Sequence, residues 1–126
     1  MKKNILLVDD DPLIIRMYQN KLSKEGYTVK TAFNGEEALI QVMKEKPDLI
    51  LLDIMMPKMN GVETLKALKG EPKTEMIPVI ILTNLGDNPE DVKNAKDLGA
   101  LDYLVKSEIT LRELSERVKR VIEIGK

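Results

Sequence analysis

Four short apolar runs of this chain are each followed at once by side chains that could do chemistry. These side chains are, in chain order, Asp9, Asp10 and Asp11, then Asp53, then Thr83, and finally Lys106. Crowded carboxylates repel one another, and this repulsion favours a divalent cation with oxygen ligands such as Mg²⁺. A hydroxyl and an ammonium group add the donor and the mobile positive charge that a phosphoryl group requires. The residue types therefore indicate a site for Mg²⁺ and a phosphoryl group.

The composition excludes most other kinds of site. The 126 residues include no histidine and no cysteine, which excludes disulfides, thiolate catalysis and most transition-metal centres. Carboxylates, hydroxyls, lysines and backbone carbonyls remain, and they suit a hard cation rather than zinc or iron. With no other nucleophile better placed, Asp53 is the natural acceptor, since a carboxylate can form an acyl phosphate.

Charge and hydropathy exclude further partners. Twenty Lys and Arg residues oppose 21 Asp and Glu residues, which leaves a formal net charge of −1. Without a basic excess, we expect no direct binding to nucleic acid and no attraction to anionic membranes. No apolar run approaches the roughly 18 residues of a membrane-spanning helix, and the run after Lys2 and Lys3 is too short for a signal peptide. We therefore expect a cytoplasmic protein with no membrane insertion.

The runs that must position these side chains have the pattern of buried strands. Short apolar runs bounded by polar residues are typical of strands in a parallel sheet with both faces covered. Strands of this kind are expected over 5–8, 49–52, 79–82 and 103–105, with Leu101 before the last, and an edge strand is expected over 27–32. Ligands of such sheets bind at the carboxyl ends of the strands, so we expect the polar side chains to share one rim.

Capping patterns predict five helices between and after these strands. Their expected starts are Asp11-Pro12, Asn34 with Glu37, Gly61, Asn88-Pro89, and Thr110 with Glu113, and the first four are expected to stop before Gly26, Pro47, Gly70 and Gly99. The last helix is expected to end almost at Lys126, and one of its faces is charged. Its other face carries an apolar stripe of Leu111, Leu114, Val118, Val121 and Ile122. Alternating strands and helices predict an α/β fold, a doubly wound (βα)₅ parallel five-stranded sheet with helices on both faces. We expect residues 1–126 to form this single domain, with no output domain.

Together the motifs resemble the receiver domains of two-component response regulators. The matching residues are Leu6-Leu-Val-Asp-Asp-Asp-Pro12, Leu51-Leu-Asp-Ile-Met-Met-Pro57 with Met59 and Gly61, Ile81-Leu-Thr83, Gly99-Ala and Asp102-Tyr-Leu-Val-Lys106. They lie in the family's order and span essentially the whole chain. The resemblance implies the flavodoxin-like receiver fold, with strand order 2-1-3-4-5, in a stand-alone regulator similar to chemotaxis regulators.

The resemblance implies a phosphorylation switch rather than a metabolic enzyme. Asp53 would accept a phosphoryl group from the phosphohistidine of a sensor histidine kinase or phosphotransfer protein. Asp10, Asp53 and the backbone carbonyl of Met55 would bind Mg²⁺, and Asp9 would act mainly through water. Catalysis would be limited to the protein's own phosphorylation and autodephosphorylation.

The resemblance also implies how phosphorylation would be read. Lys106 would pair with the phosphate, and Thr83 would be drawn towards it. Tyr103 would turn inward as Thr83 moves, and so alter the surface formed by the fourth helix, the last strand and the last helix. An unidentified downstream protein would bind that surface, and the regulator would be a monomer or a phosphorylation-dependent dimer.

Two features depart from the family's pattern. Ser107 stands where members usually have a proline in a cis bond. Because a cis bond before a non-proline residue costs about 2.5–4 kcal/mol, the Lys106-Ser107 bond is either a strained cis bond or, as we favour, a trans bond with a rearranged loop. Met55 and Leu85 are bulky and apolar at two positions that shield the phosphate from water in this family, and they predict slow autodephosphorylation.

Three other functions remain open at this point. A phosphatase with an aspartate nucleophile would carry a second acid two residues later, where this chain has Met55, and would need a cap domain. A flavodoxin-like electron carrier would need a phosphate-binding loop of Ser, Thr and Gly residues after the first strand. This chain has Asp9, Asp10 and Asp11 there, and their charges would repel an FMN phosphate. A receiver-like module that only binds partners is indicated by Ser107 alone. Asp11 itself is expected to cap the first helix.

Overall fold

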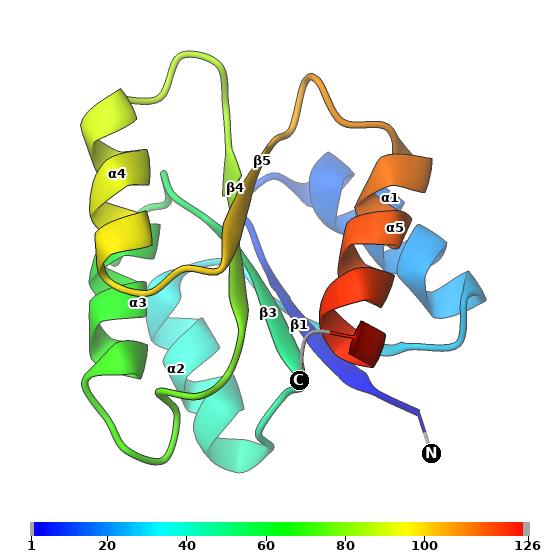
Figure 1. Ribbon diagram of the computed structural model, residues 1–126, viewed down its shortest axis with the longest axis horizontal. Helices are drawn as coiled ribbons and strands as arrows, with labels where there is room; N and C mark the ends of the chain where they lie inside the picture. The colour runs from blue at the N-terminus through cyan, green and yellow to red at the C-terminus, as the bar shows by residue number, and fades with distance from the viewer. Residues whose placement is uncertain (1, 125–126) are drawn as a thin grey trace.

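The apolar runs form the strands of one parallel sheet in a computed structural model that describes residues 2–124 (Figure 1). The strands are β1 (Asn4–Val8), β2 (Thr28–Ala32), β3 (Leu49–Asp53), β4 (Val79–Thr83) and β5 (Asp102–Val105). They are hydrogen bonded in the order β2-β1-β3-β4-β5, and every neighbouring pair is parallel. The predicted strand order and the predicted edge position of β2 are both confirmed.

Helices cover both faces of this sheet, with α1 and α5 on one side and α2, α3 and α4 on the other (Figure 1). They are α1 (Pro12–Lys24), α2 (Gly35–Lys44), α3 (Gly61–Lys69), α4 (Pro89–Asp97) and α5 (Leu111–Lys119), which continues as a π-helical segment, η1 (Arg120–Ile124). At four predicted helix starts, the side chain of the N-cap residue accepts a hydrogen bond from a backbone N–H of the first turn. These residues are Asp11, Asn34, Asn88 and Thr110. Helix α3 begins with a full capping box of Asn60 and Glu63, which the expected start at Gly61 did not include. No helix within residues 2–124 has both the length and the apolar character that crossing a bilayer requires.

Both faces of the central strands are buried, which explains why their apolar runs are continuous. Every residue of β3 and β4 is buried. In β1, Leu6 and Val8 join the core beneath α2, α3 and α4, whereas Ile5 and Leu7 join the core beneath α1 and α5. Burying one such side chain contributes roughly 1.5–3 kcal/mol. The two cores therefore hold the strand ends in fixed positions.

The last helix differs from its expected form in two ways. Leu111 of the predicted apolar stripe is 38% exposed, whereas the other members are buried or partly buried. Arg117 of the charged face pairs with Asp102 of β5, and both side chains remain 39% exposed. Helical periodicity identifies one side of a helix, but it does not say how far along the helix the sheet reaches or which strand lies opposite. The expected end close to Lys126 lies outside the described residues.

Candidate functional site

Four strand ends meet at one edge of the sheet and bring predicted site residues together. Asp53 and Thr83 are the last residues of β3 and β4, and Asp9 and Lys106 are the first residues after β1 and β5. The N–H of Asp9 donates to the carbonyl of Ala32 at 3.1 Å, and the N–H of Lys106 donates to the carbonyl of Thr83 at 2.8 Å. These bonds continue the parallel sheet by one residue. The strand ends therefore share one rim, as a parallel sheet requires.

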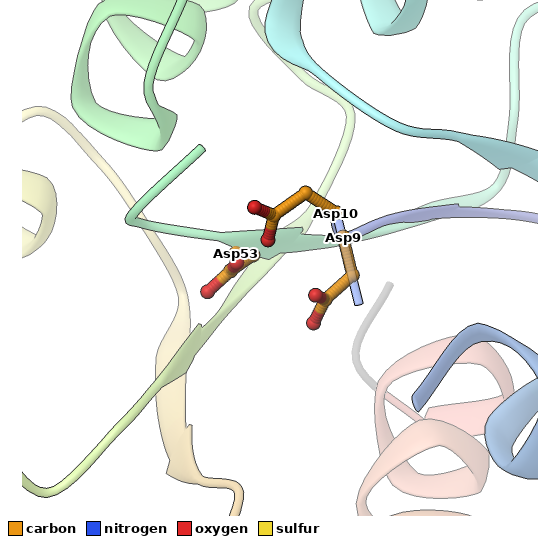
Figure 2. A group of neighbouring side chains, drawn as sticks. All are labelled: Asp9, Asp10 and Asp53. Atoms are coloured by element: carbon orange, nitrogen blue, oxygen red, sulfur yellow. The ribbon is translucent and has the colours of Figure 1, made fainter. Parts of the chain in front are cut away.

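Asp9, Asp10 and Asp53 form a cluster of carboxylates at this rim (Figure 2). One carboxylate oxygen from each residue lies within 4.8 Å of the other two. Asp9 and Asp53 are buried, with 0% and 1% exposure, whereas Asp10 is exposed. A cation could therefore enter from the side of Asp10 and reach the two buried acids.

Lys106 supplies a buried positive charge to the cluster. Its Nζ donates to Asp9 Oδ2 at 2.8 Å and lies 3.3 Å from Asp53 Oδ1, with the side chain 7% exposed. The second contact has the distance of an ion pair without the geometry of a hydrogen bond. Asp53 Oδ1 is thus a buried oxygen without a hydrogen-bond partner among residues 2–124. One ammonium group faces two buried carboxylates, so the cluster retains negative charge and an uncommitted ligand oxygen.

Burial changes the ionisation of this cluster. Burial and the neighbouring charge of Asp9 raise the pKa of Asp53 to about 7, although Lys106 opposes this rise. Burial also raises the pKa of Asp9, against the hydrogen bond from Lys106. Burial alone would lower the pKa of Lys106, but its contacts with the two carboxylates outweigh burial and raise it. Asp53 therefore binds a proton near neutral pH unless a cation takes its place, and this set of carboxylate oxygens fits Mg²⁺.

Thr83 and Tyr103 are directed to a different region from the acid cluster. Thr83 is buried, but its hydroxyl donates to Asp87 Oδ2 at 2.9 Å. Tyr103 is 39% exposed, and Lys96 Nζ lies 5.3 Å from the centroid of its ring. Both residues line one hollow of about 620 Å³ formed by β4, the β4–α4 loop, α4 and β5. The structure therefore groups Asp9, Asp10, Asp53 and Lys106, and it groups Thr83 with Tyr103 beside them.

Two further residues shape the site: Asp87, which the sequence indicates only weakly, and Gly61, which belongs to the motif that follows Asp53. Asp87 Oδ2 also accepts the N–H of Asn84 at 2.8 Å, which closes a turn in the β4–α4 loop. An acid at this spacing after a strand is an ordinary turn pattern. A side chain at Gly61 would place its Cβ 2.3 Å from the backbone oxygen of Asp53. The glycine therefore allows the start of α3 to approach the backbone of the candidate acceptor.

The backbone after Lys106 agrees with the expectation drawn from Ser107. The described part of the chain contains no cis peptide bond, so the Lys106-Ser107 bond is trans. The trans bond still lets the Lys106 ammonium group reach both Asp9 and Asp53. Replacement of the family's proline therefore leaves the lysine in the cluster.

Comparisons with known proteins agree with this geometry. The family model of the response regulator receiver domain matches residues 5–119. The chain is 43% identical over 122 residues to the alkaline phosphatase synthesis transcriptional regulatory protein PhoP of Bacillus subtilis (strain 168). The aligned region covers 97% of this chain and 49% of PhoP. It is similar to the solved chemotaxis response regulator CheY4 of Vibrio cholerae, with a TM-score of 0.87, 33% identity, and coverage of 96% of this chain and 99% of that one. The phosphorylated cyanobacterial phytochrome response regulator RcpA has a TM-score of 0.84 at 30% identity, over 100% of this chain and 97% of that one.

The extent of these matches shows which part of a protein is shared. The chain spans about half the length of PhoP and nearly the whole length of CheY4. The family model runs from β1 to the end of α5, so it includes every strand end at the rim. On this evidence the chain belongs to the family of response regulator receiver domains.

Proposed function

We propose that this receiver domain is a switch activated by phosphorylation of Asp53. Receiver domains of response regulators act in phosphorylation-dependent signalling and not as metabolic enzymes, and they typically bind Mg²⁺ at an acidic pocket. The proposal for Asp53 rests on one observation: this buried acid lies beside the other two carboxylates and 3.3 Å from Lys106 Nζ, and its Oδ1 has no hydrogen-bond partner among residues 2–124. RcpA, which is similar in structure, is described as phosphorylated.

In the proposed reaction, a carboxylate oxygen of Asp53 attacks the phosphorus of a phosphohistidine on a sensor histidine kinase or phosphotransfer protein. A P–O bond forms while the P–N bond breaks, and the leaving imidazole takes up a proton. Lys106 Nζ, which lies 3.3 Å from Asp53 Oδ1, would pair with an oxygen of the transferred group. We propose that this exchange takes place in the cytoplasm.

We propose that Asp10, Asp53 and the backbone carbonyl of Met55 hold Mg²⁺, and that Asp9 acts mainly through water. The close approach of the three carboxylates supports this ligand set. Asp9 already shares its Oδ2 with Lys106, which favours an indirect role for this residue. When bound, the dication would neutralise the acids and the oxygens of the incoming phosphoryl group.

We propose that Thr83 and Tyr103 transmit phosphorylation to the surface of α4, β5 and α5, where an unidentified downstream protein would bind. Their common hollow supports this link, because movement of one residue changes the space open to the other. The domain would act as a monomer or a phosphorylation-dependent dimer. Its independence from an output domain stays a prediction.

We also propose slow autodephosphorylation. Met55 and Leu85 are 53% and 69% exposed, in the loops that follow β3 and β4. Large apolar side chains at this opening would restrict the approach of a hydrolytic water to the acyl phosphate.

Incubation with Mg²⁺ and acetyl phosphate, followed by intact mass spectrometry, tests the proposed function. The wild type should gain one phosphoryl group, and Asp53→Asn should gain none. Asp48→Asn is the matched control, because Asp48 precedes β3 at the opposite end of the same strand and should leave phosphorylation unchanged. An unmodified wild type would contradict the proposal and would favour a module that only binds partners.

A further inference from the structure

A carboxylate outside the acid cluster holds the hydroxyl of Thr83. Thr83 Oγ1 lies 2.9 Å from Asp87 Oδ2 and 3.3 Å from the carbonyl oxygen of Asn84. The same Asp87 oxygen accepts the N–H of Asn84 at 2.8 Å, and the N–H of Asp87 donates to the carbonyl of Asn84 at 3.0 Å. Thr83 is 3% exposed, so water has little access to replace these partners. The Asp87 side chain therefore fixes both the hydroxyl and the turn that follows β4.

The Thr83 hydroxyl has one hydrogen to donate. A carboxylate is a strong acceptor because it is charged, and so is a phosphoryl group on Asp53. The hydroxyl cannot donate to both acceptors in full strength at once. Any movement of Thr83 towards the phosphoryl group must therefore break its bond to Asp87.

We propose that Asp87 is a positioning residue that keeps the Thr83 hydroxyl away from Asp53 in the unphosphorylated domain. The inference rests on the proposed function, since it concerns the same phosphoryl group. Asp87 lowers the free energy of the inactive arrangement and leaves that of the active one unchanged, so its removal shifts the equilibrium between them. Thr83, Asp87 and Tyr103 line one hollow, so release of the Asp87 contact also frees the loop beside Tyr103.

Binding of beryllium trifluoride in the presence of Mg²⁺ tests this inference. Calorimetric titration should show about tenfold tighter binding to Asp87→Ala than to the wild type, the size expected for loss of a hydrogen bond to a charged acceptor. Asp87→Asn keeps an acceptor oxygen without the charge, and its binding should lie between the two. Glu90→Gln, an exposed acid in the first turn of α4, removes the same charge and should bind within about twofold of the wild type.

A double variant separates positioning from a general change in the loop. Thr83→Val removes the hydroxyl and keeps the shape of the side chain, so Asp87→Ala should no longer tighten binding when it is added to Thr83→Val. Equal tightening with and without the hydroxyl would overturn the inference. Unchanged binding to Asp87→Ala beside a responsive wild type would overturn it too, and would leave the proposed function intact. A wild type that does not bind beryllium trifluoride would overturn both.

Discussion

Two regions of this domain differ in how far they are assembled: the acid rim, formed by Asp9, Asp10, Asp53 and Lys106, and the output side, the hollow lined by Thr83 and Tyr103. At the rim, Asp9, Asp53 and Lys106 are buried and already in contact. On the output side, the Thr83 hydroxyl is bonded to Asp87 and Tyr103 is 39% exposed. Under the proposed function, the first region needs only a cation and a phosphoryl group, whereas the second must exchange hydrogen bonds and turn a side chain. Under the proposed function, the structural change on phosphorylation therefore takes place in the β4–α4 loop and not at the acid cluster.

The largest effect is expected at the rim, from Lys106→Met. The Lys106 ammonium group is the buried cation beside Asp53, and loss of one preorganised donor at a reacting centre lowers rates about 100-fold or more. The rate of phosphorylation by acetyl phosphate, followed by intact mass spectrometry, should fall by that factor. Lys73→Met, an exposed lysine, should have no effect. A rate within about threefold of the wild type would show that the rim is not preorganised around this lysine.

The same Lys106→Met variant should bind Mg²⁺ more tightly. Its Nζ contacts Asp9 Oδ2 at 2.8 Å and Asp53 Oδ1 at 3.3 Å, so it competes with a metal ion for the same carboxylates. Without the ammonium charge, the dissociation constant for Mg²⁺ in a calorimetric titration should fall about tenfold. Weaker binding in the variant would mean that the lysine organises the ligands more than it competes with the metal.

A separate effect is expected on stability, from the buried charge of Asp53. Its pKa in the folded protein is about 7, above the ordinary value of 3.8. The folded state therefore binds this proton more tightly than the unfolded state does, which adds to the free energy of unfolding. This contribution is fully present below pH 3.8 and is lost as the pH rises through about 7. In metal-free buffer, the free energy of unfolding of Asp53→Asn should rise relative to that of the wild type by on the order of 4 kcal/mol between acidic and alkaline pH.

Urea denaturation with a chelator at several pH values would measure this difference. The control is Asp48→Asn, whose free energy of unfolding should not rise relative to that of the wild type as the pH increases. Addition of Mg²⁺ should reduce the advantage of Asp53→Asn, because the dication stabilises the ionised acid of the wild type. A difference that is constant with pH would contradict the raised pKa of Asp53.

The acid rim could be predicted from the sequence, and the state of the output side could not. Asp9, Asp53 and Lys106 each end or directly follow an apolar strand, and parallel strands place such residues at one edge whatever the loops do. The partner of the Thr83 hydroxyl depends on the turn made by residues 84–87, and no periodic pattern records it. The Arg117 pair with Asp102 could not be predicted for a related reason: the charged face of a helix contains no information about the neighbouring strand.

The smallest effect is expected from Lys96→Ala. Lys96 Nζ lies 5.3 Å from the centroid of the Tyr103 ring, and a cation over an exposed ring contributes about 0.5–1 kcal/mol. Removal should favour the inward position of Tyr103 slightly and tighten beryllium trifluoride binding by about twofold to threefold, whereas Lys96→Arg should match the wild type. Calorimetric titration of both variants measures this. If Lys96→Ala tightened binding as much as Asp87→Ala, the outward position of Tyr103, and not the hydrogen bond of Thr83, would carry the energy that keeps the domain inactive.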